Sequence, residues 1–344
     1  MKKYCFLEHL EKFGPNSPQQ VISVDEALRY CKILSDQHYE NFSVVSLLLK
    51  KSLRPHFANI YAYCRWSDDI SDEVASTTES LDLLAWWRKE LDRCFDGSAS
   101  HPVFIALQLT IRIFELPKKP FSDLIDAFEQ DQTVNRYESF ADLLSYCERS
   151  ANPVGRLVLY LGKSATEETI ELSDSICTGL QLANFLQDVA RDFEIDRVYL
   201  PAESYHRFGY TESDLKNKIF NAEFRDMMTF EVNRAEQFFL DGADLVNRVD
   251  SSISKSVELF VRGGLSILSA IRQIDHNVLN QRPRLSKFKK MQLIFQTFIP
   301  RFVGRKKFMV KSKTPNAGTG QTQPNLDFDP GSINDRPPSK RNAG

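Results

Sequence analysis

The stretch QLANFLQDVARD, residues 181–192, carries apolar and polar side chains in helical register. Its apolar residues recur at the spacing of one helix face, which predicts a largely buried helix. Its polar residues step along another face at i, i+3, i+7 and i+11, and they are Gln181, Asn184, Asp188 and Asp192. Carboxylates on a buried helix need charged or hydrogen-bonding partners. This stretch therefore favours a functional site over a solvated surface helix.

A second acidic stretch, RWSDDISDE at residues 65–73, places Asp68 and Asp72 one helical turn apart, with Arg65 on the same face. Like charges at this spacing repel each other, and a divalent cation between them would remove that cost. Mg²⁺ takes oxygen ligands and commonly binds one or two carboxylates together with substrate phosphate. Arg65 could hold phosphate oxygens directly. Taken alone, such an acidic run is more often a solvated helix face.

The two acidic faces together are more specific than either one. They could oppose each other across a cavity and clamp a diphosphate through several Mg²⁺ ions. Metal ions and arginine would then stabilise the charge that develops on a leaving diphosphate. The allylic carbocation left behind needs a dry pocket, where aromatic ring faces can stabilise it. The pair of motifs thus predicts a magnesium-dependent enzyme that acts on a prenyl diphosphate.

Helical periodicity recurs elsewhere in the 344 residues, whereas strand-like runs bounded by turns are hard to find. Helices are expected over 223–247 and 256–280, and Ser139 fits an N-cap. The i, i+3, i+4, i+7 pattern of another helix is formed by Phe121, Leu124, Ile125 and Phe128. The predicted fold class is all-α, as a single-domain helical bundle around a central cavity.

Composition and charge narrow the class of protein. The formal net charge of −2 gives no reason to expect nucleic-acid binding. The six cysteines are widely and irregularly spaced, which favours reduced thiols over zinc or redox motifs. The N-terminus lacks the apolar run of a secretory signal. No stretch approaches the ~18 uninterrupted apolar residues of a spanning helix. We therefore expect a cytoplasmic protein.

The sequence changes character toward its end. We expect an N-terminal extension over 1–24, the helical domain over 25–300, and a basic, then low-complexity and disordered tail over 301–344. Residues 281–313 contain many Lys and Arg and no Asp or Glu, around an apolar stretch at 291–300. Such a segment could rest on an anionic membrane surface at the inner face of the membrane. A last core helix with a solvated basic end is the somewhat stronger interpretation.

These residues resemble the squalene/phytoene synthase family. The two Asp-x-x-x-Asp pairs are similar to the family's two aspartate-rich motifs, and the second continues as RVYLP at 197–201. The resemblance covers roughly residues 25–285. Further matching stretches follow in the family's order and spacing: HYENF at 38–42, YAYCR at 61–65, Asp131 with Tyr137 six residues later, and SANPVGR at 150–156.

Within the family, three stretches resemble the hopanoid-pathway squalene synthase subgroup HpnC, which is understood to convert presqualene diphosphate to hydroxysqualene. They are HYENFSVVSLLL, SANPVGRLVLY and QLANFLQDV. The resemblance implies an isoprenoid-synthase-like fold and Mg²⁺ as the cofactor. It implies presqualene or farnesyl diphosphate as the substrate.

The resemblance also implies a role for each matching position. Asp68 and Asp72 would bind Mg²⁺ on one side of the site, and Asn184, Asp188 and Asp192 on the other. Catalytic roles fall to Arg65 and Tyr199, at the diphosphate or bound metal, and to Tyr137, which could act on the ionised substrate or the leaving group. The diphosphate end of the pocket would be formed by His38, Asn41, Tyr61 and Gln181.

One position departs from the family's pattern. Many members place Arg directly before the first Asp of the second motif, where this chain has Gln187. One phosphate-binding charge is thus missing or supplied from elsewhere in the chain. That fits an enzyme that handles a single diphosphate better than a full cycle with two. Arg272 and Arg282 could reach phosphate, although solvated surface is the expected position of both.

The leading hypothesis is ionisation of presqualene diphosphate and capture of the cation by water. The alternative within the family is head-to-head condensation of two farnesyl or geranylgeranyl diphosphates to squalene or phytoene. Squalene formation also needs a nicotinamide hydride donor, and the chain has no G-x-G-x-x-G loop. The second motif with its RVYLP continuation argues against a non-catalytic helical lipid-binding protein, a head-to-tail prenyltransferase and a terpene cyclase. Substrate chain length and oligomeric state stay open.

Overall fold

The acidic stretch 181–192 lies in the long helix α10, Glu167–Glu194. The computed structural model of the protein describes residues 4–18, 20–37, 49–286 and 292–293. Helix α10 begins with a capping box between Thr166 and Thr169, which satisfies backbone N–H groups of its first turn. The apolar face of the stretch is buried, as predicted, through Leu182, Phe185, Leu186 and Val189. Burial of each such side chain stabilises the fold by roughly 1.5–3 kcal/mol.

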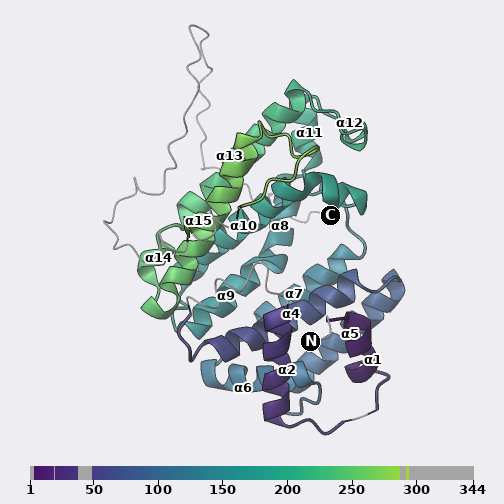
Figure 1. Cartoon of the computed structure of the whole chain (residues 1–344), viewed down its shortest axis with the longest axis vertical. Helices are drawn as coiled ribbons and strands as arrows, with labels where there is room; N and C mark the ends of the chain where they lie inside the picture. Colours follow the sequence, from purple (N-terminus) through teal and green to yellow (C-terminus); the bar gives the residue numbers. More distant parts are fainter. Residues whose placement is uncertain (1–3, 19, 38–48, 287–291, 294–344) are drawn as a thin grey trace, which may run out of the picture. The chain divides into compact units, whose positions relative to one another are not determined.

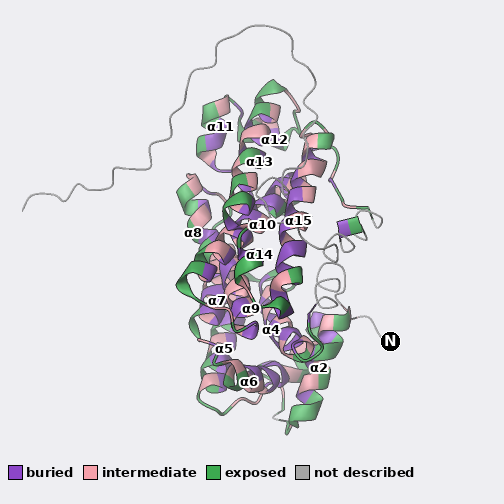
Figure 2. Ribbon diagram, turned by 90° about the vertical axis from the view of Figure 1, so that its left-hand side faces the viewer, coloured by how far each residue is buried: buried purple, intermediate pink, exposed green. Residues whose placement is uncertain are grey.

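Helix α10 is the central element of the C-terminal half of the described chain (Figure 1). It packs against α8 (Phe140–Ser150), α9 (Asn152–Leu161), α13 (Ala222–Gly242) and α15 (Ser251–Gln273). Shorter helices complete this half: α11 (Ala202–Phe208), α12 (Glu212–Lys216) and α14 (Leu245–Arg248). The buried residues of these helices face one another, while their outer faces are exposed (Figure 2).

Helix α4, Arg54–Asp72, has the corresponding place in the N-terminal half and carries the first acidic stretch. It packs against α2 (Val24–Gln37), α5 (Thr77–Phe95), α6 (Pro102–Phe114) and α7 (Lys119–Asp131). The core beside α4 is aromatic, because the rings of Trp66 and Trp87 stack at 5.2 Å with an interplanar angle of 10°. The first helix of the chain, α1, spans Phe6–Phe13.

A glycine allows α9 and α10 to approach closely. A Cβ atom at Gly155 would lie 2.5 Å from Cys177 Sγ and 2.5 Å from Ser173 Oγ, which is closer than real contacts of this kind. The SANPVGR stretch therefore contributes to the fold through helix packing, and it fixes α9 beside the helix that carries the second acidic motif.

Most predicted helices are confirmed, with shifted ends. Ser139 caps α8 in a capping box with Asp142. The helix expected over 223–247 is divided into α13 and α14, and the one expected over 256–280 begins earlier and ends earlier, as α15. At the end of α13 only glycine fits against α10, since a Cβ atom at Gly242 would lie 2.6 Å from the Leu172 carbonyl oxygen.

The chain is all-α, as predicted, and the part that the structure describes contains no strand. In the same part, no helix combines the length and the apolar character that crossing a membrane requires. The tail over 301–344 and the apolar stretch at 291–300 lie almost wholly outside the described residues. The division of the chain at residues 24 and 300 stays a prediction.

Candidate active site

Aspartates lie in the last turns of three helices at the candidate site. Asp68 and Asp72 occupy the last two turns of α4, Asp131 is the last residue of α7, and Asp188 and Asp192 occupy the last turns of α10. Helix C-termini carry partial negative charge, so cationic side chains are the usual residues there. The last turns of α4 and α7 contain no basic residue. The helix ends thus concentrate negative charge, which a bound cation would stabilise.

The first acidic motif is balanced by an arginine on its own helix. Arg65 Nη1 donates to Asp68 Oδ2 at 3.2 Å, and its Nη2 forms an ion pair with Oδ1 of Asp69. The side chain of Asp69 is fully buried, whereas that of Asp68 keeps 43% of its surface exposed. Asp68 is therefore reachable by a ligand, and Asp69 holds the guanidinium from behind.

The second acidic motif is balanced by a distant arginine. Arg282 pairs in bidentate fashion with Asp188, through Nε to Oδ1 and through Nη2 to Oδ2 at 2.7 Å. Gln187 Nε2 donates to the carbonyl oxygen of Pro283, which fastens the segment after α15 to α10. Arg282 was expected on solvated surface, and this is corrected: it supplies a guanidinium beside the position where Gln187 replaces the family's arginine.

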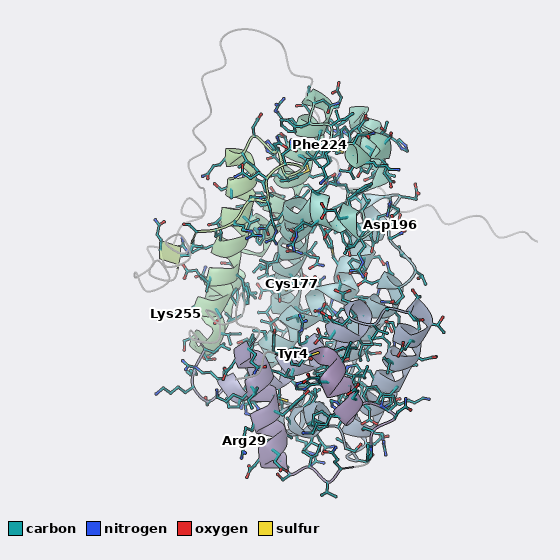
Figure 3. The ribbon with its side chains drawn as sticks, turned by 45° about the vertical axis from the view of Figure 1, so that its right-hand side comes forward. Tyr4, Arg29, Cys177, Asp196, Phe224 and Lys255 are labelled. Atoms are coloured by element: carbon teal, nitrogen blue, oxygen red, sulfur yellow. The ribbon has the colours of Figure 1, made fainter. Side chains whose placement is uncertain are left out.

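Arg197 lies among the acidic helix ends. It follows α10 by three residues, where its backbone N–H donates to the Asp192 carbonyl oxygen at 2.8 Å. Its Nη2 donates to Asp72 Oδ1 of α4 at 3.1 Å. Its charge also acts favourably on Asp131 and Asp192, and lowers the pKa of each relative to burial alone. Arg197 thus links the two acidic motifs, through its guanidinium to Asp72 and through its backbone to Asp192. Figure 3 labels the neighbouring Asp196 on the same loop.

An aromatic cluster borders these charges. Tyr199 stacks on Phe185 with ring centroids 3.8 Å apart and an interplanar angle of 8°. Tyr137 and Tyr146 lie within 6.0 Å of Tyr199. Backbone hydrogen bonds set this arrangement, because the segment 198–203 pairs with 135–138, as in the bond from Ala202 N to the Tyr137 carbonyl oxygen at 2.9 Å.

Asp131 joins the acidic residues to the aromatic cluster. Its Oδ2 accepts from the Tyr146 hydroxyl at 2.9 Å, while its Oδ1 is buried without a hydrogen-bond partner among the described residues. Burial, followed by the charge of Asp131, raises the pKa of Tyr137, so its hydroxyl stays protonated at neutral pH and can donate but not act as a base. A buried carboxylate oxygen without a donor is a position at which a cation or a donor on a ligand would fit.

Burial and mutual repulsion make several carboxyl groups harder to ionise. Burial, and then repulsion from Asp72, raises the pKa of Asp68 to about 7. Burial, and then repulsion from Asp188, raises the pKa of Asp192 to about 7. Burial raises the pKa of Asp131 to about 6. Strongly perturbed carboxyl groups gathered in one region are typical of functional sites.

The donor set fits hydrated Mg²⁺. Among the described residues, no three His, Cys, Asp or Glu side chains lie close enough together to enclose a metal ion by themselves. The candidate donors on α4, α7 and α10 are carboxylate oxygens together with the amide oxygen of Asn184, and oxygen is the ligand type that Mg²⁺ prefers. Mg²⁺ usually keeps several waters and completes its coordination with one or two carboxylates and substrate phosphate. The residues therefore suit an ion shared with a diphosphate and not an all-protein cage.

The remaining predicted residues fall in different places. Tyr61 lies one turn before Arg65 on α4, where burial raises its pKa to about 12. On α10, Gln181 is half-buried, and Asn184 is exposed although it belongs to the stripe of Asp188 and Asp192. His38 and Asn41 lie outside the described residues.

Sequence reasoning did not place Asp131, Tyr146, Phe185, Arg197 or Arg282 in the site. Two of these had a local signal: Arg197 begins the RVYLP continuation of the second motif, and Asp131 begins the stretch that ends in Tyr137. The other three had none. Tyr146 and Phe185 fit an ordinary apolar helix face, and Arg282 is one of many basic residues in its segment.

A pocket of about 340 Å³ lies elsewhere in the described part of the chain. It is formed by the loop after α1, by α5 and by the start of α6, with Phe13, Trp86, Glu90, Arg93 and His101 among its lining residues. None of the aspartates described above lines it. We therefore assign the candidate active site by the charged and aromatic groups and not by this pocket.

The sequence of the chain is similar to those of known proteins. The family model of squalene/phytoene synthase matches residues 35–289. A 15-cis-phytoene synthase of Synechocystis sp. is 30% identical over 287 residues, which cover 80% of this chain and 85% of that protein. A hydroxysqualene synthase of Zymomonas mobilis is 36% identical over 180 residues, 51% of this chain and 59% of that protein.

Among solved structures, squalene synthase HpnC from Alicyclobacillus acidocaldarius superposes with a TM-score of 0.72 at 40% identity. The match covers 74% of this chain and 96% of that one. The residues that the family model matches include α4, α7 and α10 with all the aspartates described above. On this evidence the chain belongs to the squalene/phytoene synthase family.

Proposed function

We propose that the protein ionises presqualene diphosphate and traps the rearranged cation with water to give hydroxysqualene. As a squalene/phytoene synthase family enzyme, the protein acts on prenyl diphosphates. The finer assignment is carried by one observation: identity is 40% to an HpnC squalene synthase and 36% to a hydroxysqualene synthase, against 30% to a phytoene synthase.

The reaction balances without an electron donor. The C–O bond of the substrate breaks, and the diphosphate leaves with the bonding electron pair. The cyclopropane ring of the cation opens, a water oxygen forms the new C–O bond, and that water loses one proton. No hydride is needed, in agreement with the absence of a G-x-G-x-x-G loop from the sequence.

We assign the diphosphate end to the acidic helix ends and their arginines. Bound Mg²⁺, held by Asp68 and Asp72 on α4 and by Asn184, Asp188 and Asp192 on α10, would stabilise negative charge on the leaving group. Arg65 and Arg197 carry fixed positive charge at the same ends. Fixed cations need no reorganisation as the diphosphate departs, which favours the transition state over the ground state.

We assign the hydrocarbon cation to the aromatic cluster. The ring faces of Phe185, Tyr146 and Tyr199 offer negative quadrupole density that attracts a cation. Tyr137 keeps its proton, so its hydroxyl is suited to donate a hydrogen bond to the departing diphosphate or to orient water. His38, Asn41, Tyr61 and Gln181 remain proposed contacts at the diphosphate end.

The second candidate function is head-to-head condensation to squalene or phytoene. The observation in its favour is coverage, because the Synechocystis phytoene synthase matches 80% of this chain and the hydroxysqualene synthase matches 51%. Gln187 departs from the arginine that the resemblance suggests, but it does not decide against this function, because Arg282 supplies a guanidinium to the neighbouring Asp188.

Product analysis separates the two. Purified protein with Mg²⁺ and without nicotinamide receives either farnesyl diphosphate or presqualene diphosphate, and products are identified by gas chromatography–mass spectrometry. We expect hydroxysqualene from presqualene diphosphate and nothing from farnesyl diphosphate. Presqualene diphosphate formed from farnesyl diphosphate would assign the squalene form of the second function, and no product from either substrate would refute formation of both hydroxysqualene and squalene.

A further inference from the structure

The N-terminal segment contacts the first acidic motif. Residues 4–13 precede the part of the chain that matches the family, 35–289. The hydroxyl of Tyr4 nevertheless donates to Asp69 Oδ2 at 2.7 Å. Asp69 lies on α4, directly after Asp68 and three residues before Asp72, and its side chain is fully buried. Tyr4, labelled in Figure 3, thus reaches the helix that carries Arg65 from outside the family region.

Asp69 holds two groups at once. Its Oδ1 forms the ion pair with Arg65, and its Oδ2 accepts from Tyr4. Arg65 in turn donates to Asp68 through its other terminal nitrogen. A buried carboxylate must be paired and hydrogen-bonded to remain charged. Without the tyrosine hydroxyl, Oδ2 of Asp69 would become a second acceptor for Arg65, and a guanidinium readily binds both oxygens of one carboxylate.

Packing holds Tyr4 in this position. Phe6 is buried and meets Trp66 edge-on, with ring centroids 5.2 Å apart and an interplanar angle of 78°. His9 Nδ1 and the Tyr30 hydroxyl share a hydrogen bond of 2.8 Å. The same hydroxyl accepts from Trp66 Nε1 at 3.0 Å. Because Trp66 follows Arg65 in sequence, α1 is fixed to the turn of α4 that presents the arginine.

We propose that Tyr4 is a positioning residue for Arg65. Its hydroxyl occupies one oxygen of Asp69, so that Arg65 is shared between Asp69 and Asp68 and faces the diphosphate of the substrate. Tyr4 itself touches no substrate. The proposal deepens the proposed function and depends on it, since it needs a prenyl diphosphate at Arg65.

The test compares Tyr4→Phe with Tyr210→Phe. Tyr210 is also buried, and its hydroxyl donates to a backbone carbonyl oxygen, that of Ile219, at 2.9 Å. Its contacts lie with Tyr205 and Phe224, away from α4. Binding of inorganic pyrophosphate with Mg²⁺ is measured by calorimetry, and the melting temperature is recorded for each variant. Each variant therefore loses one buried hydroxyl, and only Tyr4→Phe loses it beside Asp69.

We expect Tyr4→Phe to weaken pyrophosphate binding about 3- to 30-fold, which lies within the range of coupling between residues in contact. Tyr210→Phe should leave it unchanged. In an Arg65→Ala background, Tyr4→Phe should add no further loss, which separates action through Arg65 from a general loss of structure. Equal affinity of Tyr4→Phe and wild type, or an undiminished effect without Arg65, would overturn the proposal.

The same measurements distinguish a failure of the proposed function from a failure of the role assigned to Tyr4. Wild-type protein that binds no pyrophosphate with Mg²⁺ would refute the proposed function itself. Wild-type protein that binds it, with Tyr4→Phe equal to Tyr210→Phe, would refute only the role of Tyr4. If Tyr4→Phe does not fold, Asp69→Asn in the wild-type and Arg65→Ala backgrounds tests the carboxylate through which Tyr4 acts, and equal pyrophosphate affinity of Asp69→Asn and wild type would overturn the proposal.

Discussion

The two acidic motifs differ in where their positive charge comes from. On α4, Asp68 and Asp69 are paired with Arg65, one turn earlier on the same helix. On α10, Asp188 is paired with Arg282, which lies 94 residues later in the chain. Asp68 and Asp69 are therefore balanced within one helix, whereas the bidentate partner of Asp188 comes from a segment that must be brought back across the fold. Each motif also has one pair of the other kind, Asp72 with the distant Arg197 and Asp188 with the neighbouring Arg191.

The two arginines also differ in what keeps them near their aspartates. Arg65 remains near Asp68 as long as α4 is helical, because residues three and four apart are neighbours on any helix. Arg282 stays near Asp188 only while the segment 281–286 is held, and Gln187 contributes to that through the Pro283 carbonyl oxygen. The second motif should therefore be the more sensitive of the two to distant substitutions.

The largest expected effect is that of Asp188→Ala. It removes a proposed Mg²⁺ ligand, and turnover of the prenyl diphosphate should fall about a thousandfold or more, at or beyond the upper range for loss of one charge-stabilising group. The matched control is Asp174→Ala on the same helix, where Arg156 forms a similar bidentate pair. Steady-state rates with far-ultraviolet circular dichroism check both. Retained turnover in Asp188→Ala would contradict the two-motif metal site.

A smaller loss is expected from Arg282→Gln, which leaves Asp188 with 11% of its side chain exposed and without its bidentate partner. The metal-free protein should lose about 2 kcal/mol of unfolding free energy, less than the ~3–5 kcal/mol for a fully buried pair because Arg282 is partly solvated. Arg284→Gln, two residues later and exposed, is the control. Urea denaturation measures both.

Gln187→Ala should act in the same direction but cost only about 1 kcal/mol, the net value of one hydrogen bond. An Arg282→Gln variant as stable as wild type would remove the contrast between the two motifs, since α10 would then not depend on the distant segment.

The smallest expected effect is on the pH dependence of pyrophosphate binding with Mg²⁺. Both acidic motifs should contribute to it. The pKa values of Asp68 and Asp192 are both raised to about 7. Carboxylates must lose their protons to bind metal, so affinity for pyrophosphate with Mg²⁺ should rise about tenfold per ionising group between pH 6 and 8. Asp68→Asn serves as the reference, because the titration of pyrophosphate itself is common to both proteins.

The stability of the metal-free protein should change in the opposite sense. The folded chain holds these protons up to about pH 7, whereas an unfolded aspartate releases them near pH ~4. The stability that these two carboxyl groups contribute is therefore fully present below about pH 4 and is lost as the pH rises to about 7. A melting temperature that rises from pH 5 to 7.5, with no flattening in Asp68→Asn, would contradict this.

Much of the fold could be predicted because its signals are local. The apolar face of α10, the cap at Ser139 and the spacing of Asp68 and Asp72 each depend on residues within two or three turns. The end of α13 at Gly242 could not be predicted, because the apolar pattern continues into α14 through Leu245 and Val246.

The candidate site was predictable to the same extent. The aspartates of each pair lie one turn apart on one helix, as their spacing suggested, but Asn184 is exposed, since a period of 3.6 places it at the edge of the stripe. The partners of the carboxylates could not be found, because nothing local distinguishes Arg282 from other arginines, or Tyr146 from a core tyrosine, until the chain has folded.

The pairing of Asp188 with Arg282 has a consequence for how the protein is made. A ribosome adds about 5–20 residues per second, so Arg282 emerges roughly 5–20 s after the helix that it must neutralise. During that interval α10 can join its neighbouring helices, but the only counter-ion for Asp188 among the described residues of that helix is Arg191, one turn later at 3.7 Å. Cellular Mg²⁺ or a proton can complete the balance, and the bidentate partner of Asp188 is present only when synthesis has passed residue 282.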